Sequence, residues 1–297
     1  MRYFLPAFLC LATATLAHEF WLQPTSFRVV VGAKIPLKLL IGSNFKGETW
    51  PRPTRRVRRF VRFGPTNLAD STDLRPALLA DSVAPALTCP AAGTHVVVLT
   101  SAPAFTELPA DQFTAYLRAE GLDDALLYRR KEGQTTKPGR EAYRRCAKTL
   151  VLATASAHAS PSPADTTYRR VLNLPLELVP EQNPYYLRPG AALTVRVLHH
   201  GQPVPSALVQ VWDATPQVAV KSGTIAAQPT HFSTRANNSG RVLLRVPGGG
   251  PYLVAVSLME AAPAGLASRA DWLSTWATLT FAGPGAAGVT NSQLFSK

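Results

Sequence analysis

Short apolar segments, separated by proline, glycine and polar residues, recur along most of the chain and predict a mainly β protein. In the first half, the segments rich in Val, Ile, Leu and Phe are 27–31, 35–41, 57–63 and 95–100. Segments of this length, bounded by Gly, Pro, Asn or Asp, are typical of strands rather than of long helices. Further strand candidates follow at 174–179, 193–199, 207–212, 241–246, 252–258 and 276–281, with 231–234 as a seventh.

The pattern divides the chain into two β-sandwich domains of immunoglobulin-like type. Six or seven short strands within about one hundred residues are typical of such a sandwich. We expect the first domain over 18–170 and the second over 171–283, followed by a flexible tail, 284–297. A run of Ala, Ser, Pro and His at 155–167 is the expected linker.

A helical insertion is predicted within the first domain, over about 108–148. Helical spacing of apolar residues indicates a first helix over 112–120, with Asp111 as its N-cap and Gly121 as its stop. A second helix is expected over 123–131. A third, from Arg140 to about Ala147, would run into a strand at 149–152.

The N-terminus changes the picture, because it has the layout of a secretory signal peptide. Arg2 precedes a short apolar run, and small residues lead to Ala17. We expect cleavage between Ala17 and His18 and a mature protein in the periplasm or outside the cell. The run is too short for a permanent membrane span, and no later segment is long and apolar enough. The mature chain is therefore expected to be soluble, with no transmembrane segment.

Cleavage there would make His18 the first residue, which places an α-amine and an imidazole on one residue. Nitrogen donors suit Cu(II), Ni(II), Co(II) and Zn(II). His95, at the start of a strand in the same domain, is the preferred second ligand. His199 and His200 are an adjacent pair whose rings would face opposite sides of a strand unless a turn begins at Gly201. A terminal histidine can equally be a by-product of where the peptidase cuts.

Two cysteines, Cys89 and Cys146, remain after loss of the leader. An oxidising compartment would allow them to form a disulfide. Two separate buried thiols are the alternative, and the sequence leaves both open.

The formal net charge of +13 is compatible with nucleic acid, but export argues against such a partner. Basic residues concentrate between Arg55 and Arg62, in a segment whose apolar residues suit a strand with an exposed face. A specific anion site at this cluster is the alternative.

Several motifs in order resemble a family of periplasmic domains of unknown function described as the NikM-like component of nickel and cobalt transport. The motifs are 18–22 (HEFWL), 113–117 (FTAYL) with 120–122 (EGL), 140–145 (REAYRR), 175–180 (PLELVP), 183–185 (NPY), 201–204 (GQPV) and 276–281 (WATLTF). The resemblance implies an exported, β-rich protein with an Ig-like C-terminal part and a role near transition-metal uptake. It implies no catalytic residue.

These observations favour a metal-binding accessory protein that handles Ni, Co, Cu or Zn at the cell envelope, with an envelope transport component as a partner. The alternative is a non-catalytic module that binds an envelope protein or a glycan through its β surfaces. An enzyme, such as a copper oxygenase built on His18, is the least favoured class. The chain has no nucleophile elbow, P-loop, dinucleotide fingerprint or HExxH helix.

Overall fold

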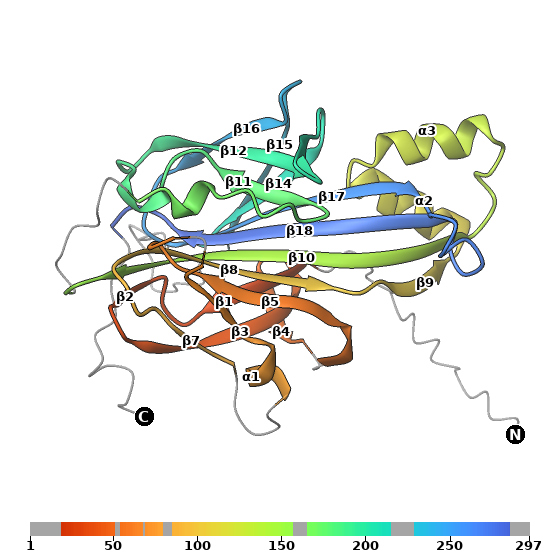
Figure 1. Cartoon of the computed structure of the whole chain (residues 1–297). Coiled ribbons are helices and arrows are strands. Elements are labelled where there is room, and N and C mark those ends of the chain that lie inside the picture. The colour runs from red at the N-terminus through yellow and green to blue at the C-terminus, as the bar shows by residue number, and fades with distance from the viewer. Residues whose placement is uncertain are drawn as a thin grey trace, which may run out of the picture.

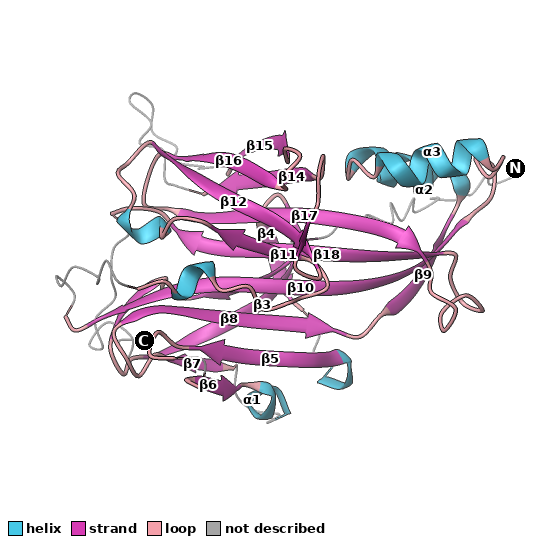
Figure 2. Ribbon diagram, turned by 45° about the horizontal axis from the view of Figure 1, so that its top comes forward, coloured by secondary structure: helices cyan, strands magenta, loops and turns pink. Residues whose placement is uncertain are grey.

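The computed structural model describes residues 19–50, 54–67, 69–79, 85–156, 165–214 and 229–285. These residues form three β layers, in which a long central sheet is covered on each face by a smaller sheet (Figure 1). The mainly β, sandwich-like fold expected from the sequence is confirmed, and helices contribute little (Figure 2). The expected leader 1–17, His18, His158 and the tail beyond residue 285 lie outside the described residues.

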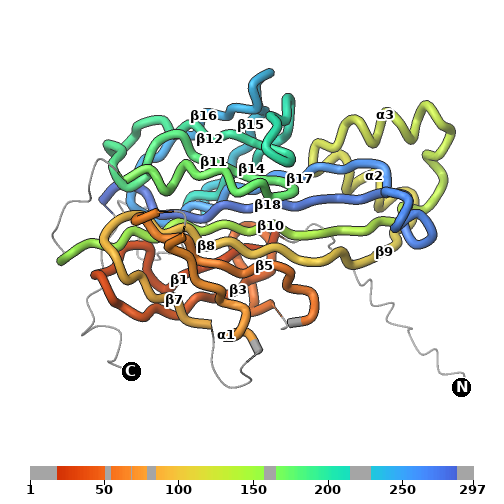
Figure 3. Tube along the Cα trace, viewed as in Figure 1, coloured from red at the N-terminus to blue at the C-terminus, as the bar shows by residue number. Residues whose placement is uncertain are grey.

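The central sheet draws its strands from both halves of the chain. In spatial order they are β15 (Thr230–Arg235), β14 (Leu208–Asp213), β17 (Pro251–Ala261), β18 (Trp272–Ala282), β10 (Gly139–Thr154), β8 (Gly93–Ser101), β5 (Val57–Phe63) and β6 (Ser71–Asp73). β2 (Arg28–Val30) and β9 (Ala104–Leu108) also pair with β10. β10 and β18, far apart in the sequence, run side by side and parallel (Figure 3). The expected boundary at 170/171 therefore separates strands that share one sheet.

The two covering sheets each come from one half of the chain. The N-terminal sheet contains β1 (Glu19–Pro24), β3 (Lys34–Ser43), β4 (Lys46–Thr49) and β7 (Ala86–Thr88). The C-terminal sheet contains β11 (Glu177–Pro180), β12 (Ala191–His199), β13 (Gln202–Pro203) and β16 (Arg241–Val246). Short 3-10 turns, η1 (Thr54–Arg56), η2 (Thr167–Arg169) and η3 (Pro184–Tyr186), lie in the connections.

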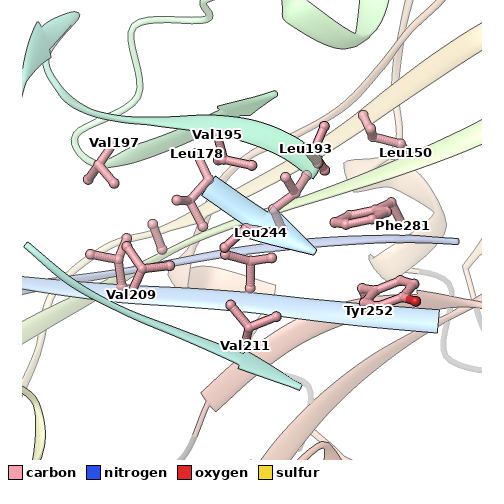
Figure 4. Close-up of a cluster of buried hydrophobic side chains, with 14 of the residues drawn as sticks. Leu150, Leu178, Leu193, Val195, Val197, Val209, Val211, Leu244, Tyr252 and Phe281 are labelled. Atoms are coloured by element: carbon pink, nitrogen blue, oxygen red, sulfur yellow. The ribbon is translucent and has the colours of Figure 1, made fainter. Parts of the chain in front are cut away.

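A hydrophobic core lies on each side of the central sheet. Between the central and C-terminal sheets, Val195 and Leu244 meet Val211 and Phe281 (Figure 4). The second core lies beneath the N-terminal sheet. β10 contributes to both cores: Cys146, Leu150 and Leu152 face the C-terminal sheet, while Ala147, Val151 and Ala153 face the N-terminal sheet. A strand buried on both faces explains the nearly continuous apolar run at 149–153.

Three α-helices are present among the described residues: α1 (Arg75–Leu79), α2 (Ala110–Ala119) and α3 (Asp123–Lys131). The two predicted helices at 112–120 and 123–131 are confirmed, and Gly121, with φ of +64°, ends the first. Pro109, not Asp111, occupies the N-cap position of α2. The α2–α3 hairpin lies at the end of the central sheet where β9 ends and β10 begins (Figure 1). Phe113 and Leu117 of α2 pack in one cluster with Met259 and Trp272.

The third predicted helix, Arg140 to Ala147, is wrong. These residues belong to the 16-residue strand β10, which here pairs with β9 on one edge and with β18 on the other. The local sequence favours helix formation, but pairing on both edges overrides this weak preference. The helical insertion is therefore shorter than the expected 108–148.

Candidate functional site

Three glutamates from distant parts of the sequence are buried on the N-terminal-sheet side of the central sheet. Glu19 is the first residue of β1, Glu120 is the C-cap residue of α2, and Glu141 lies near the start of β10. Their exposed fractions are 6%, 6% and 2%. We call these three residues the carboxyl cluster.

The position of Glu19 follows from how β1 crosses the central sheet. Thr278 and Thr280 of β18 donate hydrogen bonds from their Oγ1 atoms to the carbonyl oxygens of Phe20 and Leu22, at 2.7 and 2.6 Å. Phe20 and Leu22 are themselves buried in the core beneath the N-terminal sheet. The start of β1 is therefore bonded to β18, and Glu19 directly precedes these contacts.

Glu120 and Glu141 each have hydrogen-bond donors. Glu120 Oε2 accepts from Ser257 Oγ at 3.2 Å and from Gln210 Nε2 at 3.3 Å. Glu141 Oε1 accepts from the Tyr116 hydroxyl at 3.1 Å and from Ser274 Oγ. These donors tie α2 to β10, β14, β17 and β18.

Glu19 differs from the other two, because its Oε2 atom is buried without a hydrogen-bond partner. Most buried polar atoms in folded proteins have a partner, since an unmatched one costs about 1–3 kcal/mol. An unmatched carboxylate oxygen can accept a proton or contact a cation. It is the feature of the cluster that its own fold does not explain.

Burial raises the pKa of each carboxyl in the cluster. The pKa of Glu19 rises to about 7 through desolvation, with repulsion from Glu120 adding to the shift and attraction to Arg145 opposing it. The pKa values of Glu120 and Glu141 are also raised to about 7, mainly by desolvation. At neutral pH the cluster therefore holds exchangeable protons.

A basic and aromatic group adjoins the cluster. The Arg145 guanidinium lies 5.8 Å from the centre of the Phe20 ring and 5.5 Å from that of the Tyr143 ring. Arg56, from η1, lies 5.4 Å from the Tyr143 ring. Arg145 and Glu141 share a face of β10, four residues apart, so one strand supplies both a carboxyl group and a guanidinium cation.

His95 lies in the interior and uses both ring nitrogens. Its Nδ1 is 3.1 Å from Arg62 Nη1, and its Nε2 is 2.8 Å from the carbonyl oxygen of Ala91. Arginine can only donate, so Nδ1 accepts and Nε2 carries the proton. Desolvation lowers the pKa of this ring, which keeps it neutral. Neither nitrogen is directed at the carboxyl cluster, and the role of His95 as a metal ligand stays a prediction.

His199 and His200 lie side by side at the end of β12. Their ring centroids are 4.6 Å apart, and positive φ angles at His200 and Gly201 show that the turn begins there. His199 Nε2 is 3.4 Å from Glu260 Oε2, which is an ion-pair distance without hydrogen-bond geometry, since the same nitrogen lacks a hydrogen-bond partner. His231 stacks on Trp212, with ring centroids 4.8 Å apart. Across the described ranges, no group of three His, Cys, Asp or Glu side chains is placed to hold a metal ion.

Cys89 and Cys146 are free, buried thiols in the structure. Cys146 belongs to the core under the C-terminal sheet and Cys89 to the core under the N-terminal sheet. The central sheet stands between them, so the disulfide considered from the sequence is absent from this arrangement. The alternative of two separate buried thiols describes it.

The basic segment Arg55–Arg62 forms η1 and most of β5, as the strand prediction required. Its exposed face is incomplete, because Arg62 is only 4% exposed. Arg62 Nη2 pairs with Asp70 Oδ1 at 2.9 Å and with Thr72 Oγ1 at 2.8 Å. These contacts, with the one to His95, satisfy Arg62 within the protein. An anion site over the whole cluster stays a prediction.

Most of the carboxyl cluster is not visible in the sequence. Glu19 lies in the N-terminal motif, where it was not chosen as a ligand, and the sequence pattern placed Glu120 and Glu141 in helical segments. The signal was the alternation of Glu141, Tyr143 and Arg145, which places them on one face of a strand. That pattern was hidden by the helix assigned to the same residues.

No helix within the described part of the chain has the length and apolar character needed to cross a membrane. No curated protein matches the chain. Among solved structures, the chain aligns with dimeric latent PorU from Porphyromonas gingivalis at 9% identity and a TM-score of 0.18. The alignment covers 89% of this chain and 20% of PorU, so the chain spans about a fifth of that protein. A likeness this weak carries no argument about function.

A family model described as a domain of unknown function, DUF4198, matches residues 15–260. The match includes the start of β1, the α2–α3 hairpin and all but the last strand of the central sheet. The description names neither a metal nor a transporter, so the nickel and cobalt association expected from the resemblance stays a prediction. The chain belongs to the DUF4198 family of domains of unknown function.

Proposed function

We propose that this protein is an exported metal-binding accessory protein, which holds a divalent transition metal through His18 at its processed N-terminus. The observation that carries the proposal is the unpartnered, buried Oε2 of Glu19. His18 is bonded directly to Glu19, and consecutive Cα atoms are about 3.8 Å apart. Cleavage after Ala17 would therefore create an amine and an imidazole next to an unsatisfied carboxylate.

The donor chemistry suits a borderline transition metal. An amine and an imidazole are nitrogen ligands, which favour Cu(II), Ni(II), Co(II) and Zn(II), with copper strongest by intrinsic affinity. A carboxylate oxygen adds a third donor of a type that zinc and other divalent ions also accept. The proposal needs no histidine from elsewhere in the fold, which fits the internal hydrogen bonds of His95.

The raised pKa of Glu19 makes binding sensitive to pH. A metal binds the deprotonated amine, imidazole and carboxylate, whose ordinary or raised pKa values are about 8, about 6.5 and about 7. Each proton competes with the metal, so affinity should rise as pH increases from 6 to 8. Glu120 repels the Glu19 charge, and a bound cation would relieve that repulsion.

In the envelope, a site of this kind would receive or present a metal ion to a transport component. The nickel and cobalt association implied by the sequence resemblance supports such a role. The alternative role as a protein- or glycan-binding module would not use the amine and imidazole of His18.

The test compares protein that begins at His18 with protein carrying one additional N-terminal alanine. Calorimetric titration with Cu(II), Ni(II), Co(II) and Zn(II) at pH 7.5 should show a loss of affinity of about tenfold or more in the extended form, because the α-amine and the imidazole no longer belong to one residue. Glu19→Gln should weaken binding in the same direction. Glu132→Gln, at an exposed glutamate on the α2–α3 hairpin, is the matched control and should bind as wild type. Equal affinity of the His18 and extended forms would overturn the proposal.

A further inference from the structure

The α2–α3 hairpin contains a cavity of about 280 Å³ on the side of α2 that faces α3. From α2 it is lined by Asp111, Thr114 and Arg118, which are spaced i, i+3 and i+7 and therefore lie on one stripe of the helix. Phe113 and Leu117 lie on a neighbouring face of the same helix, in the hydrophobic cluster with β17 and β18. The packing of α2 thus leaves a polar stripe directed at α3.

From α3 the cavity is lined by Leu126, Arg129 and Arg130, at spacing i, i+3 and i+4, and Thr135 lines it from the following loop. Three guanidinium groups, counting Arg118, thus border one small space. Asp111 supplies the one acidic side chain of the lining. The positive charge at the cavity exceeds the negative charge by two.

Arg129 is the unusual member of this lining, because it is only 2% exposed. Its Nη2 donates to the carbonyl oxygen of Lys137 at 2.6 Å, and its guanidinium carbon lies 4.9 Å from the centre of the Phe113 ring. These contacts explain why the side chain lies against the hairpin. They leave its Nε–H buried without an acceptor, which is an unfavourable state that an oxygen ligand would relieve.

Stabilisation of the helix end does not account for this arrangement. Arg129, Arg130 and Lys131 occupy the last turn of α3, where cations interact favourably with the helix dipole. Exposed side chains suffice for that effect, whereas Arg129 is buried and Arg118 approaches from the other helix. The negative helix end carries roughly half a charge, which the three guanidinium groups outweigh.

We infer that this cavity is an anion-binding site for a carboxylate or phosphate group of a small molecule. Guanidinium N–H groups match the oxygens of both in geometry and charge. The hydroxyl of Thr135 can supply a further donor, while Thr114 Oγ1 already donates to the carbonyl oxygen of Ala110 at 2.7 Å. The site is separate from the proposed metal site and does not depend on it.

The test is calorimetric titration of the mature protein with inorganic phosphate and, separately, with citrate, at low ionic strength and again at about 0.15 M salt. The double variant Arg118→Gln/Arg130→Gln removes two exposed charges and leaves the buried Arg129 in place. It should weaken binding about tenfold or more, as expected for loss of charge-assisted hydrogen bonds. Tighter binding of citrate than phosphate would assign the site to carboxylates, and the reverse order would assign it to phosphates.

The matched control is Arg188→Gln/Arg245→Gln, which removes the same charge at exposed positions outside the cavity. This variant should bind as wild type. Equal weakening in both double variants, or no binding of either anion to wild type, would overturn the inference. Glu19→Gln should leave anion binding unchanged, so failure of the metal proposal would not be mistaken for failure of this one.

Discussion

Buried ionisable side chains lie on both faces of β10. On one face they form an ion pair, and on the other a carboxylate oxygen has no partner. On the face towards the C-terminal sheet, Lys148 Nζ contacts Glu177 Oε1 at 2.8 Å, and both side chains are at most 1% exposed. Glu177 also accepts hydrogen bonds from the backbone N–H groups of Leu172 and Leu174. On the opposite face lie the three acids of the carboxyl cluster, with one oxygen unmatched.

The difference separates a charge pair that completes the fold from a charge group that the fold leaves incomplete. Lys148 and Glu177 neutralise each other and join the central and C-terminal sheets. The carboxyl cluster has raised pKa values and an empty acceptor position, both of which weaken the folded state at neutral pH. The unmatched oxygen of Glu19 is the observation on which the proposed function rests.

The largest effect on stability should come from breaking the buried Lys148–Glu177 ion pair. Lys148→Met leaves the Glu177 carboxylate buried without its counterion, which should lower the free energy of unfolding by about 3–5 kcal/mol. Urea unfolding at pH 7 would measure this loss. The double variant Lys148→Met/Glu177→Gln should recover part of it, because no unpaired charge remains.

An exposed ion pair provides the comparison for that experiment. Arg140 Nη2 lies 2.6 Å from Asp271 Oδ1, and the two side chains are 39% and 49% exposed. Arg140→Met should cost at most about 1 kcal/mol, because solvent screens surface pairs. If Lys148→Met lowered the free energy of unfolding no more than Arg140→Met does, the Lys148–Glu177 pair would not join the two sheets as described.

A smaller effect should come from removing one acid of the cluster. The folded-state pKa of Glu141 is raised to about 7 from 4.5, so its contribution to stability is fully present below pH 4.5 and is lost as pH rises through 7. Glu141→Gln removes this loss. The variant should match wild type near pH 4.5 and exceed its free energy of unfolding at pH 8 by up to about 3 kcal/mol.

Urea unfolding at a series of pH values from 4.5 to 8 would test this sign. Glu107→Gln, at an exposed glutamate on the neighbouring strand β9, should leave the pH dependence unchanged. If the free energy of unfolding fell more steeply with rising pH for Glu141→Gln than for wild type, the Glu141 carboxylate would stabilise the folded state when ionised, contrary to this prediction.

The smallest effect should come from reductant. Burial raises the pKa of Cys89 to about 12 and that of Cys146 to about 11, so each thiol is protonated and unreactive in the folded state. Reductant should not change Tm, and both thiols should react with an alkylating reagent only after unfolding. A fall in Tm on reduction would instead show that Cys89 and Cys146 form a disulfide in solution, because loss of a disulfide typically costs about 2–5 kcal/mol.

The sequence predicts those elements whose pattern is decided locally. β5 at 57–63, β16 at 241–246 and α3 at 123–131 appear at the predicted bounds, because alternation, helical spacing and flanking turn residues define them. β10 was misassigned at its first residues, since pairing with β9 and β18 determines their conformation. The sequence also gives no sign that both halves of the chain contribute strands to the central sheet, because the pairing of β10 with β18 joins residues far apart in the sequence.

The candidate site was less accessible to sequence reasoning than the fold. The importance of His18 follows from the leader pattern alone. No local pattern shows that Glu120, at the end of a helix, would lie beneath other segments. Burial of a carboxyl depends on residues distant in the sequence, here Ser257 and Gln210 for Glu120.

The last described strand, β18, fills the middle of the central sheet rather than an edge, with β17 on one side and β10 on the other. Until residues 272–282 are available, both neighbours present unpaired backbone edges that invite association with other chains. The central sheet is therefore complete only when the chain through Ala282 is present, and the strands of the first half have no finished sheet of their own.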